Sequence, residues 1–126
     1  MLEMVAPTSL RHIEGFSARR VAWLQEKLLA EGRWIKPLAI EEEHNLVLDG
    51  QHRLEAALEL GLRRVPVVRF AYPTVEVWSL RPKYAFVWRD VVQRALSGDI
   101  YPYKTVKHRF PRPICTCNFT LEELRE

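Results

Sequence analysis

A short junction constrains the fold of this chain more than any other feature. Residues 45–48 (Asn-Leu-Val-Leu) are typical of a strand, and residues 51–60 repeat apolar side chains in the rhythm of a helix. Asp49 and Gly50 stand between the two, with no room for a longer loop. Gly61 is suited to end the helix in the left-handed conformation. The sequence therefore predicts a strand that leads directly into a helix.

The other elements are predicted from apolar periodicity and turn residues. In chain order they are a helix from a Ser17 cap to Gly32, a strand at 35–40 that pairs with 45–48, strands at 65–72 and 74–80, a helix at 86–96 ended by Gly98, an irregular segment at 100–110, and a short last helix opened by a capping box at 120–123. No repeat or flexible linker divides them, so we expect one domain over residues 1–126.

The composition is that of an ordinary globular protein. With 126 residues, 48% of them apolar, the chain can bury a continuous core without cross-links. No apolar run is long enough to cross a bilayer, and residues 1–10 do not resemble a secretion signal, so we expect a cytoplasmic location. Cys115 and Cys117 are too close for an ordinary disulfide and too few for a zinc site, and we interpret them as reduced thiols.

Positive charge is concentrated in the C-terminal third. The net charge is +3, and the basic residues are densest at Lys104, Lys107, Arg109 and Arg112. Such a cluster could bind either a nucleic-acid backbone or a small phosphorylated ligand. Charge alone does not decide between these two kinds of partner.

The junction at residues 49–53 has the chemistry of an anion site. A strand that leads into a helix brings unpaired main-chain N–H groups and the positive end of the helix dipole to one point. Gly50 lets a phosphate approach the backbone, and His52 and Arg53 add side-chain donors. Asp49 would suit a divalent cation. Taken singly, Asp49 could be only a helix cap and the other two only surface residues; their grouping around a glycine favours a site.

At this junction the sequence resembles a known family. Residues 49–57 (Asp-Gly-Gln-His-Arg-Leu-Glu-Ala-Ala), followed by Leu60-Gly61 and Val65-Pro66-Val67, look like the nucleotide-phosphate motif of the ParB/sulfiredoxin fold. The likeness is closest to the free L-serine kinases, including the siderophore-pathway serine kinase, whose motif reads Asp-Gly-His-His-Arg. Gln51 departs from that pattern. The resemblance implies an α+β fold: a compact single domain with a small mixed sheet flanked by helices.

Two further segments resemble the same kinases. Glu14 lies in the loop before the first predicted helix, where those kinases carry the glutamate taken as the base, and residues 34–37 (Trp-Ile-Lys-Pro) match a Trp-Lys-Pro stretch with one residue inserted. Near the C-terminal end, the family pattern Ser-Pro-Lys-Thr-Thr-Arg-His-x-x-Pro resembles the segment at residues 101–111. Lys104, Thr105, a cation at Lys107, His108 and Pro111 are kept, and Val106 replaces a threonine.

The resemblance implies a kinase that transfers a phosphoryl group from ATP or ADP to free L-serine or a related small hydroxyl compound, with Mg²⁺. It implies Glu14, Asp49 and His52 as catalytic residues, with Asp49 on the metal. The nucleotide would be held by Lys36, Gly50, Gln51, His52 and Arg53, and the substrate by Lys104, Thr105, Lys107 and His108. We expect a monomer or homodimer, with no membrane or nucleic-acid partner.

Two other functions within this fold are weighed against the kinase. A ParB-like nucleotide- and DNA-binding regulatory module would have a helix-turn-helix domain after the phosphate motif, and only one predicted helix follows before the basic segment. A sulfiredoxin needs a nucleophilic cysteine where Gln51 stands, and Gln has no thiol for that chemistry. The sequence therefore favours the kinase over both.

Overall fold

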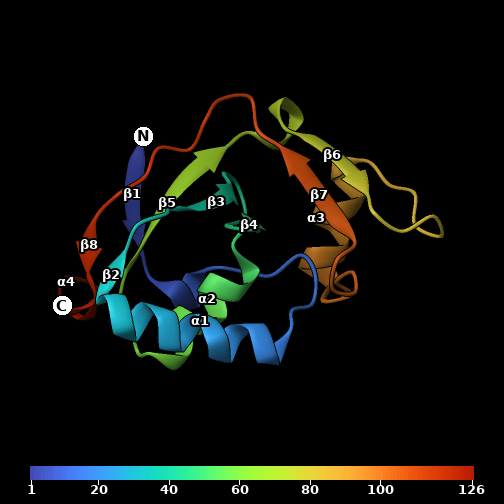
Figure 1. Cartoon of the computed structure of the whole chain (residues 1–126). Coiled ribbons are helices and arrows are strands. Elements are labelled where there is room, and N and C mark those ends of the chain that lie inside the picture. The colour runs from blue at the N-terminus through green and yellow to red at the C-terminus, as the bar shows by residue number, and fades with distance from the viewer.

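The computed structural model describes all residues of the chain, 1–126 (Figure 1). In chain order the elements are β1 (Leu2–Val5), the 3-10 turn η1 (Pro7–Ser9), α1 (Ala18–Glu31), β2 (Arg33–Trp34), β3 (Leu38–Glu41), β4 (Val47–Asp49), α2 (Gln51–Glu59), β5 (Val65–Phe70), the 3-10 turn η2 (Tyr72–Thr74), β6 (Glu76–Ser79), α3 (Trp88–Ser97), β7 (Val106–Arg109), β8 (Phe119–Thr120) and α4 (Leu121–Arg125).

The central sheet is mixed and has the strand order β1-β5-β3-β4. β3 pairs with β5 in parallel, whereas β1 pairs with β5 and β4 pairs with β3 in antiparallel orientation. β4 is an edge strand, and Ala39 of β3 lies opposite Asp49 at its end. The junction between β4 and α2 is therefore at the open edge of the sheet, where a ligand has access.

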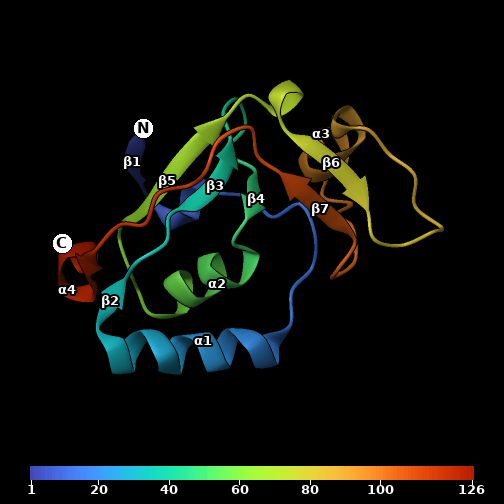
Figure 2. The same ribbon diagram turned by 45° about the horizontal axis from the view of Figure 1, so that its top comes forward.

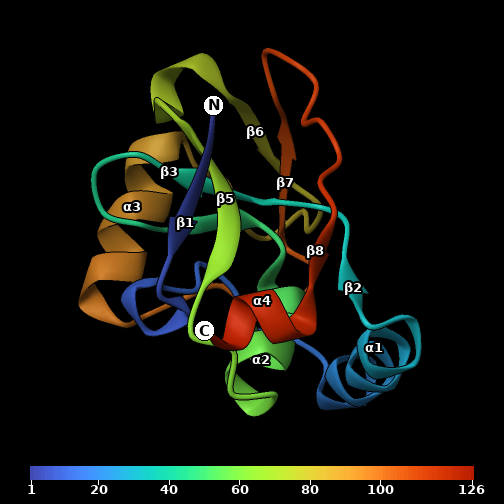
Figure 3. The same cartoon turned by 90° about the vertical axis from the view of Figure 1, so that its left-hand side faces the viewer.

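The two faces of this sheet bury two separate cores, because side chains alternate along each strand. Leu38 and Ile40 of β3 point into the first core, which the buried residues of α1, α2 and α4 complete, and Ala39 points into the second. The second core is closed by α3 and by residues of β7 and η2. Figure 3 shows α1 and α3 on opposite sides of the sheet.

β6 and β7 form a separate two-stranded antiparallel ribbon beside the sheet, in which Val77 lies opposite His108 (Figure 2). The loop before α1 lies against the segment that leads into β7. Gly15 donates its amide hydrogen to Tyr101 O at 2.8 Å, and Tyr101 donates to Ile13 O at 3.1 Å. The loop that contains Glu14 and the C-terminal basic segment are thus adjacent, although about ninety residues separate them in the sequence.

Several predicted boundaries are confirmed. Ser17 caps α1 by accepting a 3.2 Å hydrogen bond from the amide of Arg20, and Gly32 ends that helix with φ 69°. The capping box at Thr120 and Glu123 opens α4. The mixed α/β fold around the β4–α2 junction is also as expected.

Other boundaries were wrong. The strand expected at 35–40 begins only at Leu38, because Trp34 pairs with β8 and Ile35 O accepts from the amide of Cys117. Residues 100–110, expected to be irregular, contain β7. The helix expected from residue 86 begins at Trp88, and β1 was not predicted.

No helix is both long and apolar enough to span a membrane.

Candidate active site

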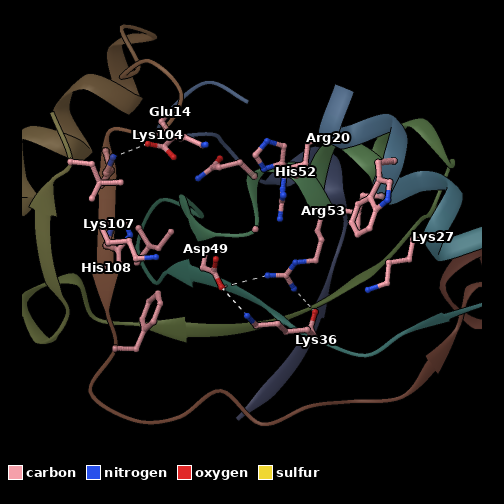
Figure 4. A pocket seen from close by; sticks show the side chains of 18 residues that line it. Glu14, Arg20, Lys27, Lys36, Asp49, His52, Arg53, Lys104, Lys107 and His108 are labelled. Carbon is pink, nitrogen blue, oxygen red and sulfur yellow. Dashed lines mark hydrogen bonds and ion pairs between the residues drawn. The ribbon is translucent and has the colours of Figure 1, made fainter. Parts of the chain in front are cut away.

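A cavity of about 630 Å³ lies where the β4–α2 junction, the loop before α1 and the segment around β7 meet (Figure 4). Ten of the eleven site residues predicted from the sequence line it, namely Glu14, Lys36, Asp49, Gly50, Gln51, His52, Arg53, Lys104, Lys107 and His108. Thr105 does not. In Figure 4, Glu14 and Lys104 lie at one end, Asp49 is central, and Arg20 and Lys27 of α1 lie at the other end. Three distant stretches of sequence therefore share one cavity.

The first turn of α2 presents main-chain donors to this cavity. The amide of Leu54 donates to Gly50 O at 2.9 Å, so the amides of residues 51–53 precede the first intrahelical hydrogen bond. Gly50 has φ 117°, and a Cβ at this position would collide with the side chain of Leu38 and lie 3.1 Å from Arg53 Nη2. Only glycine fits here, and its open backbone allows an anion to approach the helix N-terminus.

Asp49 and Arg53 form the floor of the cavity. The guanidinium of Arg53 donates to Lys36 O at 2.6 Å and to Pro37 O at 3.0 Å, and its Nη2 lies 3.5 Å from Asp49 Oδ2. Lys36 Nζ approaches the same carboxylate oxygen at 3.6 Å. Arg53 therefore ties α2 to the segment before β3, and Asp49 keeps its other oxygen free.

Glu14 is held by two successive main-chain amides. Its Oε1 accepts hydrogen bonds from Thr105 N at 3.0 Å and Val106 N at 2.8 Å, and Oε2 makes no hydrogen bond within the protein. Lys104, which precedes these amides, has φ 60°, a left-handed conformation that turns consecutive N–H groups toward one point. Burial raises the pKa of Glu14, although both amides and Arg81 act in the opposite direction. The site thus contains an oriented carboxylate that is a stronger base than a solvated one.

His52 is a neutral donor rather than a base. Its Nε2 lies 3.0 Å from the amide of Ser17, which can only donate, so Nε2 is unprotonated and the ring proton is on Nδ1. Burial lowers the pKa of His52, and the charges of Arg20 and His12 lower it further. His52 is thus suited to donate a hydrogen bond from Nδ1 and is not suited to act as a base.

Gln51 and Thr105 use their side chains within the protein. Gln51 is 6% exposed, and its amide nitrogen donates to Val47 O, so only its backbone N–H can face a phosphate. Thr105 is fully buried, and its hydroxyl donates to Pro102 O at 2.6 Å. The prediction that Thr105 binds substrate was therefore wrong for its side chain. Thr105 contributes to the site through its main-chain amide, which holds Glu14.

His108 is similarly occupied. Its Nε2 lies 2.8 Å from the hydroxyl of Tyr72, a residue that the sequence did not suggest. Burial lowers the pKa of His108 to about 4, although Asp49 and the Leu48 carbonyl raise it, so the ring is neutral at pH 7. Burial also raises the pKa of Tyr72, which keeps the hydroxyl as the donor. His108 therefore joins β7 to η2 and offers no positive charge to a ligand.

One wall of the cavity was missed in the sequence. Arg20, Trp23 and Lys27 lie three and four residues apart on α1, a spacing that places them on one helix face, and all three line the cavity. A smaller apolar cleft of about 200 Å³ opens between α1 and β2, with Leu24, Leu28, Trp34 and Ile35 in its walls. The spacing of Arg20, Trp23 and Lys27 could be read from the sequence. Only the packing of α1 beside α2 shows that this helix face lines the cavity.

The cavity is strongly positive. Two carboxylates, Glu14 and Asp49, face six cationic side chains, those of Arg20, Lys27, Lys36, Arg53, Lys104 and Lys107. Cations of this number, together with a helix N-terminus, concentrate field lines in a concave site and attract a polyanion. The expected ligand is therefore a compound with several phosphate charges.

The carboxylates of the cavity fit Mg²⁺ only if a bound phosphate supplies further ligands. Magnesium is commonly bound by one or two carboxylates together with substrate phosphates. Asp49 can supply one carboxylate oxygen, and the one group of three metal-ligating side chains, Glu41, Glu43 and His44, does not line the cavity. The residues present would hold Mg²⁺ jointly with a bound phosphate rather than alone.

The fold is the ParB/sulfiredoxin-like fold that the sequence resemblance implied. A free serine kinase in complex with AMP superposes with a TM-score of 0.88 at 14% sequence identity, over 98% of this chain and 93% of that chain. A free serine kinase with the mutation E30A, in complex with ADP, also has a TM-score of 0.88, at 13% identity over 98% of this chain and 93% of that chain.

Further structures share this fold. SbnI from Staphylococcus aureus, truncated at its C-terminus, has a TM-score of 0.88 at 11% identity, over 99% of this chain and 89% of that chain. A conserved hypothetical protein from Pyrococcus furiosus has a TM-score of 0.76 at 13% identity, over 98% of this chain and 97% of that chain. No protein-family model and no curated protein sequence matches the chain. At these identities the likeness is one of fold.

Proposed function

We propose that the protein is a small-molecule kinase that transfers the terminal phosphoryl group of ATP or ADP to the hydroxyl of free L-serine or a related compound. One observation carries this proposal: an oriented carboxylate with a raised pKa, a helix N-terminus and six cations line the same cavity. Phosphoryl transfer needs these parts, namely a base for the acceptor, donors for the phosphates and positive charge near the moving group.

The nucleotide would lie at the α1 and α2 end of the cavity. The amides of residues 51–53 and Nδ1–H of His52 would donate to its phosphates, with Arg20 and Lys27 beside them. The apolar cleft next to Leu24 would receive the purine ring of the nucleotide. This cleft adjoins the main cavity, with which it shares the lining residues Leu24, Lys27, Lys36 and Arg53. Two neighbours that bind AMP and ADP support a nucleotide ligand for this fold.

The acceptor would lie at the opposite end, between Glu14, Lys104 and Lys107. Oε2 of Glu14 is free to remove the proton of the hydroxyl while Oε1 remains fixed by Thr105 and Val106. The hydroxyl oxygen then bonds to the terminal phosphorus, and the bond from that phosphorus to the bridging oxygen of the nucleotide breaks. The products are a phosphate monoester and a nucleotide with one phosphate fewer, and the proton resides on Glu14.

Charge stabilisation is the second part of the mechanism. Negative charge develops on the bridging oxygen as the bond breaks. The α2 amides together with Lys36 and Arg53, which line the cavity, would stabilise that charge. Asp49, together with the phosphates, would hold Mg²⁺, which would supply further neutralisation of the phosphate charge. The Asp49 carboxylate would orient that ion.

A ³¹P NMR assay of the purified protein tests the proposal. Incubation with Mg²⁺, ATP or ADP, and a panel of L-serine, L-threonine, L-homoserine and a nucleoside should give a new phosphomonoester resonance with at least one acceptor. L-alanine, which has no hydroxyl, is the matched control and should give none. Nucleotide binding without a phosphomonoester from any acceptor would contradict the kinase and favour a ParB-like nucleotide-binding module.

A further inference from the structure

A polar cluster outside the proposed catalytic groups lies behind the phosphate loop. It consists of His12, Gln51 and Glu55. His12 is two residues before Glu14 in the loop, whereas Gln51 and Glu55 are one turn apart on α2. The cluster therefore connects the segment that carries the base to the helix that carries the phosphate-binding amides.

The hydrogen-bond directions in this cluster follow from chemistry. Gln51 Nε2 donates to Val47 O, a carbonyl that can only accept, so Gln51 Oε1 faces His12 as an acceptor. The carboxylate of Glu55 is also an acceptor and lies 2.9 Å from His12 Nε2. Both partners are satisfied when both ring nitrogens of His12 carry a proton. His12 is then a double donor that spans the first two turns of α2.

The cluster is partly shielded from solvent. The side chains of His12 and Glu55 are 18% and 22% exposed, and Gln51 is buried. An ion pair of this kind contributes little to stability on average, because removing charge from water offsets the attraction. Its geometric effect is more specific, because it fixes where the loop sits on the helix.

Neighbouring contacts hold the same loop on both sides of His12. The His12 ring packs on Phe16 with centroids 5.0 Å apart, and Phe16 meets the His52 ring edge-on at 6.4 Å. On the other side of the loop, Glu14 is fixed by the amides of Thr105 and Val106. The loop is thus anchored to the β7 segment by Glu14 and to α2 by His12, with a second bond to α2 from the amide of Ser17 to His52 Nε2.

We infer that His12 is a positioning residue, which holds the Glu14 loop at a fixed distance from the N-terminus of α2 through its two hydrogen bonds to Gln51 and Glu55. This inference rests on the proposed function, because the distance matters only if Glu14 deprotonates an acceptor for a phosphoryl group bound at α2. In this inference the side chain of Gln51, the residue that departs from the kinase motif, accepts a hydrogen bond from His12 and does not contact a ligand.

Kinetics of three variants test this inference. His12→Phe keeps the ring on Phe16 and removes both donors, so kcat should fall about tenfold or more, since small misplacements of reacting groups have effects of this size. The dissociation constant for ADP should stay within about threefold, because the α2 amides are unchanged. His12→Gln keeps an N–H near the Nε2 position and should recover part of kcat. His44→Phe, which lies beside Glu41 away from the cavity, is the control and should match wild type.

The result that overturns the inference is a kcat of His12→Phe reduced by less than about tenfold, or reduced only in proportion to a weaker ADP affinity. A wild-type protein without turnover would instead end the proposed function. The positioning claim is then decided by the ¹H–¹⁵N NMR shifts of the Thr105 and Val106 amides. These shifts report the position of the Glu14 carboxylate, because both amides donate to it. They should move in His12→Phe and not in His44→Phe, and unchanged shifts would overturn the claim.

Discussion

The carboxylate of Glu14 accepts a 2.8 Å hydrogen bond from the main-chain amide of Val106, ninety-two residues further along the chain. Together with the adjacent bond from Thr105, this contact fixes one carboxylate oxygen and leaves the other free at the cavity. Val106, which replaces a threonine of the kinase pattern, contributes through its backbone, so the loss of a hydroxyl there does not affect how Glu14 is held.

Glu14→Gln should remove turnover and keep nucleotide binding. The amide oxygen of Gln can accept from Thr105 and Val106, so the loop should keep its place, but the amide cannot take a proton. We expect kcat to fall by about 10²- to 10⁴-fold, the usual contribution of a positioned base. Steady-state kinetics and calorimetric titration with ADP check this. Glu26→Gln, an exposed position on α1, is the control, and comparable turnover in the two variants would exclude Glu14 as the base.

The pH profile should report the raised pKa of Glu14. A base acts only when ionised, so kcat/KM should rise with pH through the pKa of Glu14, at values above the 4.5 of an unperturbed glutamate. This acidic limb should be absent from any residual activity of Glu14→Gln. A limb with its midpoint at or below 4.5 would show that burial does not tune this group.

Asp49→Asn should weaken the response to magnesium. The substitution keeps the shape of the side chain and removes the charge that would hold the ion against Lys36 and Arg53. We expect the Mg²⁺ concentration for half-maximal activity to rise about tenfold or more. Asp99→Asn, whose carboxylate pairs with Arg94 away from the cavity, should leave the magnesium titration unchanged. Identical titration curves for Asp49→Asn and wild type would remove Asp49 from the metal site.

Gly50→Ala should disrupt both stability and nucleotide binding. The new Cβ would meet Leu38 and would require an alanine at φ 117°, so we expect a loss of about 2 kcal/mol or more in the free energy of unfolding. Gly32→Ala is a matched control with φ 69° and nothing within 4 Å of the added carbon. It should lose only about 1 kcal/mol and bind ADP normally. Denaturant unfolding and ADP titration distinguish the two, and equal effects would contradict the close approach at Gly50.

His108 should make the protein less stable in mild acid. Its pKa is about 4 in the folded protein and 6.5 for an unperturbed histidine, so in this window the unfolded chain binds a proton that the folded protein excludes. Stability from this group is therefore complete above pH 6.5 and is lost as the pH falls through 4, by about 3 kcal/mol at most. His108→Gln should flatten the pH dependence of the free energy of unfolding between these values. An unchanged slope would show that His108 is not buried in neutral form.

The local parts of the fold were predictable from the sequence, and the non-local parts were not. Ser17, Gly32 and the capping box at Thr120 mark helix ends by chemistry within a few residues, so the predictions there held. β7 was missed because Val106 to Arg109 becomes a strand only through pairing with β6, about thirty residues earlier.

The same distinction holds for the candidate site. The motif at residues 49–53 is contiguous, and all five of its residues line the cavity. By contrast, the internal partners of Gln51 and His108 and the contribution of Arg20 depend on contacts between distant segments. The motif at residues 49–53 and the family resemblance indicated residues that share the cavity, whereas the direction of each side chain required the tertiary structure.

An isotope-transfer measurement tests the central claim most directly. Wild-type protein is incubated with Mg²⁺, ATP or ADP, and L-serine labelled with ¹⁸O in its hydroxyl, and the product is followed by ³¹P NMR. If the acceptor oxygen attacks phosphorus beside Glu14, a phosphomonoester should form with the label in its bridging position, and Glu14→Gln should form almost none. The absence of a labelled phosphomonoester with L-serine and with the other hydroxyl acceptors, or its formation at an unchanged rate in Glu14→Gln, would contradict the account.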